Sequence, residues 1–186
     1  TRCLPGDLIS VVKKLVGKDL VDLIVMGTKG ASGAERVFMG SNAVRMLKHI
    51  SNRPVLAVPE TYDFQQLQKV VLPTDFMHFY EPFELQPLLE LATQWQAEIH
   101  VVYAGREFKL NPTQDSNKKV LNTRIESLKS NFVEIPLASN IAETIRSYAL
   151  ETGADLIALL QHRHSFFEAL TKEKVVYRIA FDAQIP

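Results

Sequence analysis

Residues 22–50 read DLIVMGTKGASGAERVFMGSNAVRMLKHI, and this stretch decides the fold. Its first residues belong to a nearly continuous apolar run, Leu20–Met26, which is broken only by Asp22 and is typical of a strand buried on both faces of a parallel sheet. A glycine-bearing loop, Gly27–Gly40, follows this run, and Asn42–Ile50 then has apolar residues at helical spacing. The order of strand, long loop and helix predicts an α/β fold.

The loop has a spacing that suits an anion. Gly27, Gly30, Gly40 and Ser41 form the pattern G-x2-G-x9-G-S. Glycines let the backbone turn sharply and bring its N–H groups close to a bound anion. The helix that starts near Asn42 adds unpaired N–H groups and the positive end of its dipole. We therefore predict a phosphate site here; the competing interpretation is a tight turn in which Ser41 only caps the helix.

The rest of the chain alternates between strand and helix patterns. A helix is predicted from Asp7, which can cap it, with its apolar residues Leu8, Val11, Val12 and Leu15 facing inward. Further elements are expected as strands at 55–58, 70–72, 99–103, 132–137 and 156–160, helices at 83–96, 118–130, 140–151 and 168–181, and a loop at 105–117. This alternation predicts a parallel sheet with helices on both faces.

Two parts of the chain match each other. DLIVM at Asp22 corresponds to DLIAL at Asp155, and in the preceding helices Leu8 matches Ile141. A match over this distance indicates a duplicated domain. We expect residues 1–59 to be the C-terminal half of a first domain, 60–68 a linker, and 69–186 a second domain that lacks its last strand.

A half domain has a physical consequence. Its parallel sheet would keep an open edge and uncovered apolar faces. We therefore expect residues 8–58 to pack against the second domain, a second copy of the chain, or a segment that precedes it.

These motifs resemble one known family. The segment from Asp22 to Pro59, with GTKGASG-x6-GS and NRPVLAVP, closely resembles the universal stress proteins, and KVVLPTDF and ADLIAL resemble them more loosely. The resemblance implies a tandem member, truncated at its N-terminus, with a flavodoxin-like or Rossmann-like parallel sheet. It also implies ATP binding through the glycine loop, an adenine contact from Asp75, and dimers or tandem pairs formed through the last strand.

Neither repeat holds a complete site of that kind. The first has the glycine loop but not the strand and aspartate that would precede it. The second has Asp75, but Leu160 and Arg163 stand where the first repeat has Gly27 and Gly30, and their β-carbons would block an approaching phosphate. A composite site that joins Asp75 to the first loop would need an unusual domain contact. Asp75 could equally cap the turn that follows it.

Composition excludes several classes of function. The chain has 21 basic and 21 acidic residues, which argues against a broad nucleic-acid footprint. No apolar run approaches the roughly 18 residues of a membrane helix, so no membrane partner is expected. Cys3 is the only cysteine, which fits a reducing compartment such as the cytoplasm.

Other features favour structural roles. His162 and His164, with Glu168 nearby, could suit a metal, but a polar surface loop that attracts at most an anion is favoured, and no metal requirement is expected. Phe83 and Trp95 have the spacing of core residues. No serine has a histidine–acid pattern beside it, so no catalytic residue is predicted.

Three functions compete on this basis. The first is a regulatory module that binds ATP or a related nucleotide without dedicated catalysis. The second is an interaction scaffold that binds no nucleotide. An enzyme of a related nucleotide fold fits poorly, because PTDFMHF after strand 70–72 contains no glycine and no run of serine and threonine.

Overall fold

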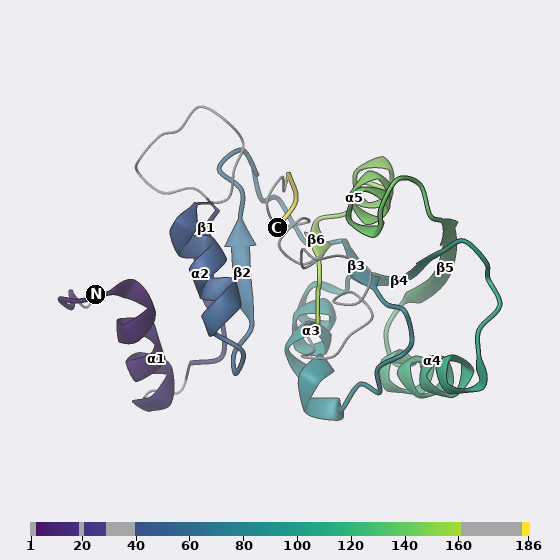
Figure 1. Ribbon diagram of the computed structural model, residues 1–186, viewed down its shortest axis with the longest axis horizontal. Coiled ribbons are helices and arrows are strands. Elements are labelled where there is room, and N and C mark those ends of the chain that lie inside the picture. The colour runs from purple at the N-terminus through teal and green to yellow at the C-terminus, as the bar shows by residue number, and fades with distance from the viewer. Residues whose placement is uncertain (1–2, 19–20, 29–39, 161–183) are drawn as a thin grey trace. The chain divides into compact units, whose positions relative to one another are not determined.

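The computed structural model describes residues 3–18, 21–28, 40–160 and 184–186 (Figure 1). The chain divides into two compact units, with a boundary between Tyr62 and Asp63. This boundary lies within the stretch 60–68. Each unit is described by itself.

The first unit is built on a pair of parallel strands. Strands β1 and β2 align Ile24 with Val55 and Gly27 with Val58. One face of this pair carries a small core of Ile9, Met46 and Ile50. The elements are α1 (Leu8–Lys18), β1 (Ile24–Gly27), α2 (Ser41–His49) and β2 (Val55–Val58). The strand–loop–helix order predicted from residues 22–50 is therefore confirmed.

The predicted inward face of α1 is right for Val12, which packs against the core of the first unit, and wrong for Leu8. Ile9 and Val16 are buried, whereas Leu8 is exposed. Asp7 caps the helix as expected, accepting a hydrogen bond from the Ser10 N–H at 3.2 Å. The same carboxylate pairs with Arg45 of α2 at 2.6 Å. This ion pair ties the start of α1 to α2, and in the resulting packing Ile9 is buried in place of Leu8.

The second unit is a parallel sheet of strand order β5-β4-β3-β6. Figure 1 shows α5 on one side of this sheet and α3 and α4 on the other. The elements are β3 (Lys69–Pro73), α3 (Pro82–Trp95), β4 (Glu98–Gly105), α4 (Pro112–Ile125), β5 (Ser130–Pro136), α5 (Ile141–Glu151) and β6 (Leu156–Ile157). The strands Val70–Leu72 and Ile99–Val102 are buried on both faces apart from a small exposed part of His100, as their apolar sequences predict.

The prediction for α4 is wrong at both ends. The helix starts at Pro112 instead of 118, inside the stretch expected to be a loop, and it ends at Ile125. Asn111 and Gln114 form a reciprocal capping box, and Pro112 occupies the first helical turn, where its missing N–H costs nothing. The earlier end of α4 lets β5 begin at Ser130, two residues before the predicted strand.

The two aromatic residues expected in the core are also placed differently. Phe83 is 71% exposed, because it lies in the first turn of α3, whereas Leu85 and Ala92 form the buried face of that helix. Trp95 is exposed at the last turn of α3 and packs edge-on against Phe64, with ring centroids 5.3 Å apart. The spacing of apolar residues in a sequence does not show which turns of a helix extend beyond the edge of the sheet.

The end of the second unit is shorter than predicted. Strand β6 covers Leu156–Ile157, compared with the expected 156–160. The predicted helix 168–181 lies outside the described residues. In the part of the chain that the structure describes, no helix has the length and apolar character needed to cross a membrane.

Candidate functional site

The first candidate site lies where β1 ends and α2 begins. Gly27 is the last residue of β1, and the next residue, Thr28, is buried and donates its N–H to the Val58 carbonyl at 2.9 Å. The Gly40 N–H donates to the Thr28 carbonyl at 2.6 Å. This bond holds the two ends of the glycine loop together at the carboxyl end of the strands. Gly30, the remaining glycine of the motif, lies in 29–39, outside the described residues.

The start of α2 has the properties expected of an anion site. Gly40 is the N-cap, with φ −59° and ψ 149°, and no side chain caps the helix. Ser41 is the first helical residue, so the interpretation of Ser41 as the N-cap is wrong. Ser41 and Asn42 are exposed, and no acidic residue lies in the first turn. Among the residues that the structure describes, the first turn at the positive end of this helix therefore has no carboxylate to neutralise it.

The second candidate residue, Asp75, belongs to the second unit. It follows β3 directly and is only 8% exposed. Its Oδ1 accepts the Met77 N–H at 2.9 Å, so Asp75 does cap its turn. Its Oδ2 is buried and has no hydrogen-bond partner among the described residues. Burial raises the pKa of the Asp75 carboxyl above its usual value, while the bond from Met77 acts in the opposite direction.

The turn around Asp75 is fixed by side chains from the elements that follow it. Thr74 Oγ1 accepts hydrogen bonds from the Phe76 N–H at 3.0 Å and from the Tyr80 hydroxyl at 2.7 Å. Burial raises the pKa of Tyr80 to about 12. From α4, Gln114 donates to the Asp75 carbonyl and Asn117 to the Phe76 carbonyl, both at 2.8 Å. The carboxylate is thus held in one orientation.

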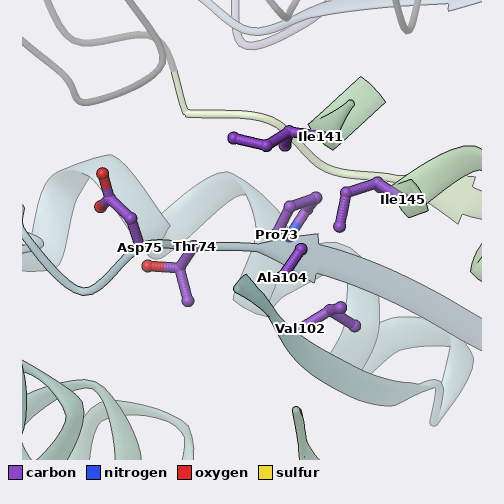
Figure 2. Close-up of a pocket in the computed structure, with 7 residues that line it drawn as sticks. All are labelled: Pro73, Thr74, Asp75, Val102, Ala104, Ile141 and Ile145. Carbon is purple, nitrogen blue, oxygen red and sulfur yellow. The ribbon is translucent and has the colours of Figure 1, made fainter. Parts of the chain in front are cut away.

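A small cavity adjoins this turn. Its volume is about 10 Å³. Figure 2 shows Thr74 and Asp75 at one side of it, whereas its other lining residues are apolar, namely Pro73, Val102, Ala104, Ile141 and Ile145. This volume is about what a single water molecule needs. The cavity therefore suits a water molecule or the edge of a flat group better than a whole nucleotide.

The buried carboxylate makes a testable prediction about stability. Replacing Asp75 with Asn keeps an acceptor for the Met77 N–H and removes a charge from a desolvated position. We expect Asp75→Asn to raise the free energy of unfolding at pH 7 by up to about 1 kcal/mol. The folded-state pKa is raised, so ionisation destabilises the native protein as pH rises through that pKa. The gain should therefore disappear as pH falls below 3.8, which urea unfolding at several pH values would measure.

The matched control is Asp115→Asn on the exposed face of α4. Asp115 pairs with Lys119 at 2.6 Å, and both side chains are largely exposed. This substitution should destabilise the protein slightly, by about 0.3–0.5 kcal/mol at pH 7. If Asp75→Asn also lowers the free energy of unfolding at pH 7, as the control does, the buried carboxylate has a partner that stabilises its charge.

The structure thus brings together part of the predicted site. Gly27, Gly40, Ser41 and Asn42 lie at one edge of the first unit, and Asp75 lies in the second. Sequence reasoning missed two groups that hold the turn around Asp75, the side-chain amides of Gln114 and Asn117, because their segment was predicted to be a loop. The signal was present as Asn-Pro-Thr-Gln at 111–114, which is a helix start.

No metal site is evident in the ranges that the structure describes. No group of three or more His, Cys, Asp and Glu residues lies close enough together to hold an ion there. His162, His164 and Glu168 lie outside those ranges. Cys3 is exposed and is a free thiol.

Together, the parallel strands and the helices that flank them define an α/β protein. Residues 3–59 match the model of the universal stress protein family. The chain is 41% identical over 58 residues to a universal stress protein of Methanocaldococcus jannaschii. The match covers 31% of this chain and 34% of that relative. Residues 3–59 are therefore similar to the universal stress protein family, as the motifs predicted.

The likeness of this chain to solved structures concerns the fold alone. A universal stress protein from Archaeoglobus fulgidus DSM 4304 aligns with a TM-score of 0.60 at 15% identity, covering 94% of this chain and 62% of that one. A universal stress family protein from Burkholderia pseudomallei aligns at 18% identity with a TM-score of 0.46, covering 67% of this chain and 96% of that one. The first alignment confirms the predicted fold class, parallel sheets with helices on both sides.

Proposed function

We propose that this chain is a regulatory module that binds ATP or a related nucleotide through the glycine loop of its first unit. One observation carries the proposal: α2 begins at Gly40 with no capping side chain, directly beside the carboxyl end of β1. The first N–H groups of a helix need partners, and a phosphate oxygen satisfies them with a charge-assisted bond. The family match over the same residues supports this assignment.

The loop and the helix have separate parts in this proposal. Gly27, Gly30 and Gly40 allow the backbone to approach the phosphates closely, since none of them has a side chain in the way. Ser41 and Asn42 supply exposed N–H groups at the positive end of α2. Asp75 lies in the second unit and is a separate candidate for contact with a base there. No metal is required in this scheme.

Binding is proposed without dedicated catalysis. The glycine loop supplies backbone N–H groups, which hold a phosphate but do not take up a proton. Nucleotide occupancy would then affect assembly, either between two copies of the chain or between paired domains through their terminal strands. We place this activity in the cytoplasm, because the only cysteine is an exposed thiol.

The test is calorimetric titration of the chain with ATP, ADP, AMP and adenosine at low salt. Affinity should rise with the number of phosphates, and adenosine should bind at least tenfold more weakly than ATP. A tenfold difference corresponds to about 1.4 kcal/mol, which is within the range of one hydrogen bond to a charged group. Equal affinity for ATP and adenosine would place the ligand somewhere other than the glycine loop.

The alternative is an interaction scaffold that binds no nucleotide. One observation favours it: the second unit exposes the apolar side chains of Met77, Phe79 and Phe83 between the end of β3 and the first turn of α3. Exposed aromatic groups of this kind are enriched in protein interfaces. If no member of the nucleotide series binds, the scaffold is the better description.

A further inference from the structure

The loop between β3 and α3 alternates between covered and exposed side chains. Phe76 and Tyr80 are buried, and His78 between them is half-buried. Met77 and Phe79, in contrast, are 47% and 44% exposed. The alternation places these two apolar side chains together on the outward side of the loop. Neighbouring exposed apolar groups of this size mark interaction surfaces more often than single ones do.

The exposed side of this loop continues into the start of α3. Glu81, the N-cap of the helix, is exposed and extends the alternation by one step. Phe83, in the first helical turn, is 71% exposed, which is the highest value among the large apolar side chains of the described residues. We call Met77, Phe79, Glu81 and Phe83 the turn surface. It combines three apolar side chains with one carboxylate.

An arginine without a carboxylate partner lies against the turn surface. The Cζ atom of Arg124, near the end of α4, is 5.3 Å from the ring centroid of Phe79. The Arg124 side chain is half-buried, and its Nε has no hydrogen-bond partner among the described residues. No carboxylate in those ranges forms an ion pair with it. Since a cation partly withdrawn from water is stabilised by such a partner, Arg124 suits a carboxylate that another molecule supplies.

The turn surface is fixed before anything binds to it. From α4, Asn117 donates a hydrogen bond to the carbonyl of Phe76 at 2.8 Å. The Tyr80 hydroxyl donates to Thr74 Oγ1 at 2.7 Å, on the covered side of the loop. A surface that is already ordered loses less conformational entropy on association, so its exposed side chains can contribute more to affinity.

We propose that the turn surface and Arg124 form a two-fold symmetric dimer interface with a second copy of this chain. Such an interface uses the same surface of both copies, so that surface has to be complementary to itself. Here the Glu81 carboxylate of each copy pairs with Arg124 of the other, and the apolar side chains pack against one another. An unrelated partner would have to supply both charges, whereas a second copy already carries them.

This interface lies entirely in the second unit. It is therefore independent of nucleotide binding at the glycine loop, and it is separate from pairing through terminal strands. A dimer that forms through another surface would not respond to substitutions at the turn surface, so the two kinds of assembly are distinguishable.

Sedimentation equilibrium of the 186-residue chain tests the association. The average mass should rise with protein concentration from that of one chain toward that of two. Phe83→Asp should weaken association by about 30-fold or more, because it places a charge among apolar side chains. The variant should still fold, since an acidic residue suits the first turn of a helix. The mass of a single chain at every concentration up to about 1 mM would overturn the proposal.

The matched control is Leu150→Asp on α5. Leu150 is 43% exposed, and Figure 1 shows α5 on the opposite side of the sheet from α3 and α4. This variant should associate as tightly as the unaltered chain. If Phe83→Asp associates as tightly as the unaltered chain, or if both variants lose association equally, the dimer does not use the turn surface and the proposal is wrong.

Reversing the charges tests the pairing of Glu81 with Arg124. Glu81→Lys and Arg124→Glu should each weaken the dimer by about tenfold, because each brings two like charges together. The double variant has opposite charges again and should associate within about threefold of the unaltered chain. Losses that multiply in the double variant would contradict the proposed pairing. Circular dichroism checks the fold of each variant; if a charge variant does not fold, Phe83→Asp and its control still decide the proposal.

Discussion

Replacing Gly40 with Asp should abolish nucleotide binding without weakening the protein. The Gly40 backbone, at φ −59° and ψ 149°, is in a region open to every residue. Asp is among the residues preferred at an N-cap, so the substitution should stabilise the chain by a few tenths of a kcal/mol. Its carboxylate would accept the N–H groups that we assign to phosphate and would repel an approaching anion. We expect ATP affinity to fall by about 100-fold or more, or about 2.7 kcal/mol.

The matched control is Gly40→Asn, which has the same shape without the charge. Asn also caps helices, so it should compete for the same N–H groups but should not repel phosphate. We expect an ATP affinity between those of the unaltered chain and Gly40→Asp, measured by calorimetry beside urea unfolding. If Gly40→Asp binds ATP as tightly as the unaltered chain, the glycine loop is not the phosphate site.

The second large effect is expected at Phe76, in the turn after Asp75. Its side chain is almost completely buried and stacks between Tyr103 and Phe132, with ring centroids at 5.8 and 6.4 Å. Replacing Phe76 with Ala should leave a cavity and lower the free energy of unfolding by about 3–5 kcal/mol. Urea unfolding would measure the loss.

Comparison with Phe76→Gly separates packing from backbone strain. Phe76 has φ 56°, a left-handed conformation that costs a residue with a β-carbon about 1 kcal/mol. Glycine adopts it freely, so Phe76→Gly should be about 1 kcal/mol more stable than Phe76→Ala. In most positions the order is the reverse. If Phe76→Gly is the less stable variant, the turn relaxes out of the left-handed region once the ring is removed.

The sequence by itself determined the architecture and one half of the candidate site. The apolar runs at 20–26 and 70–72 predicted buried parallel strands, because only residues covered on both faces have no polar alternation. The glycine spacing predicted a phosphate loop before α2, and Asp7 was identified as the cap of α1. These features are local, so a short stretch of sequence contains the whole signal.

Only the tertiary structure decided which apolar residues are covered. Leu8 and Phe83 have the spacing of core residues, but both are exposed: the buried face of α1 contains Ile9 instead of Leu8, and Phe83 lies in the first turn of α3. Leu23 and Leu156 occupy equivalent positions in the two repeats. Among the described residues, Leu156 pairs with β3, whereas the strand after Leu23 pairs only with β2. Burial depends on what packs against a residue, and that partner lies far away in the sequence.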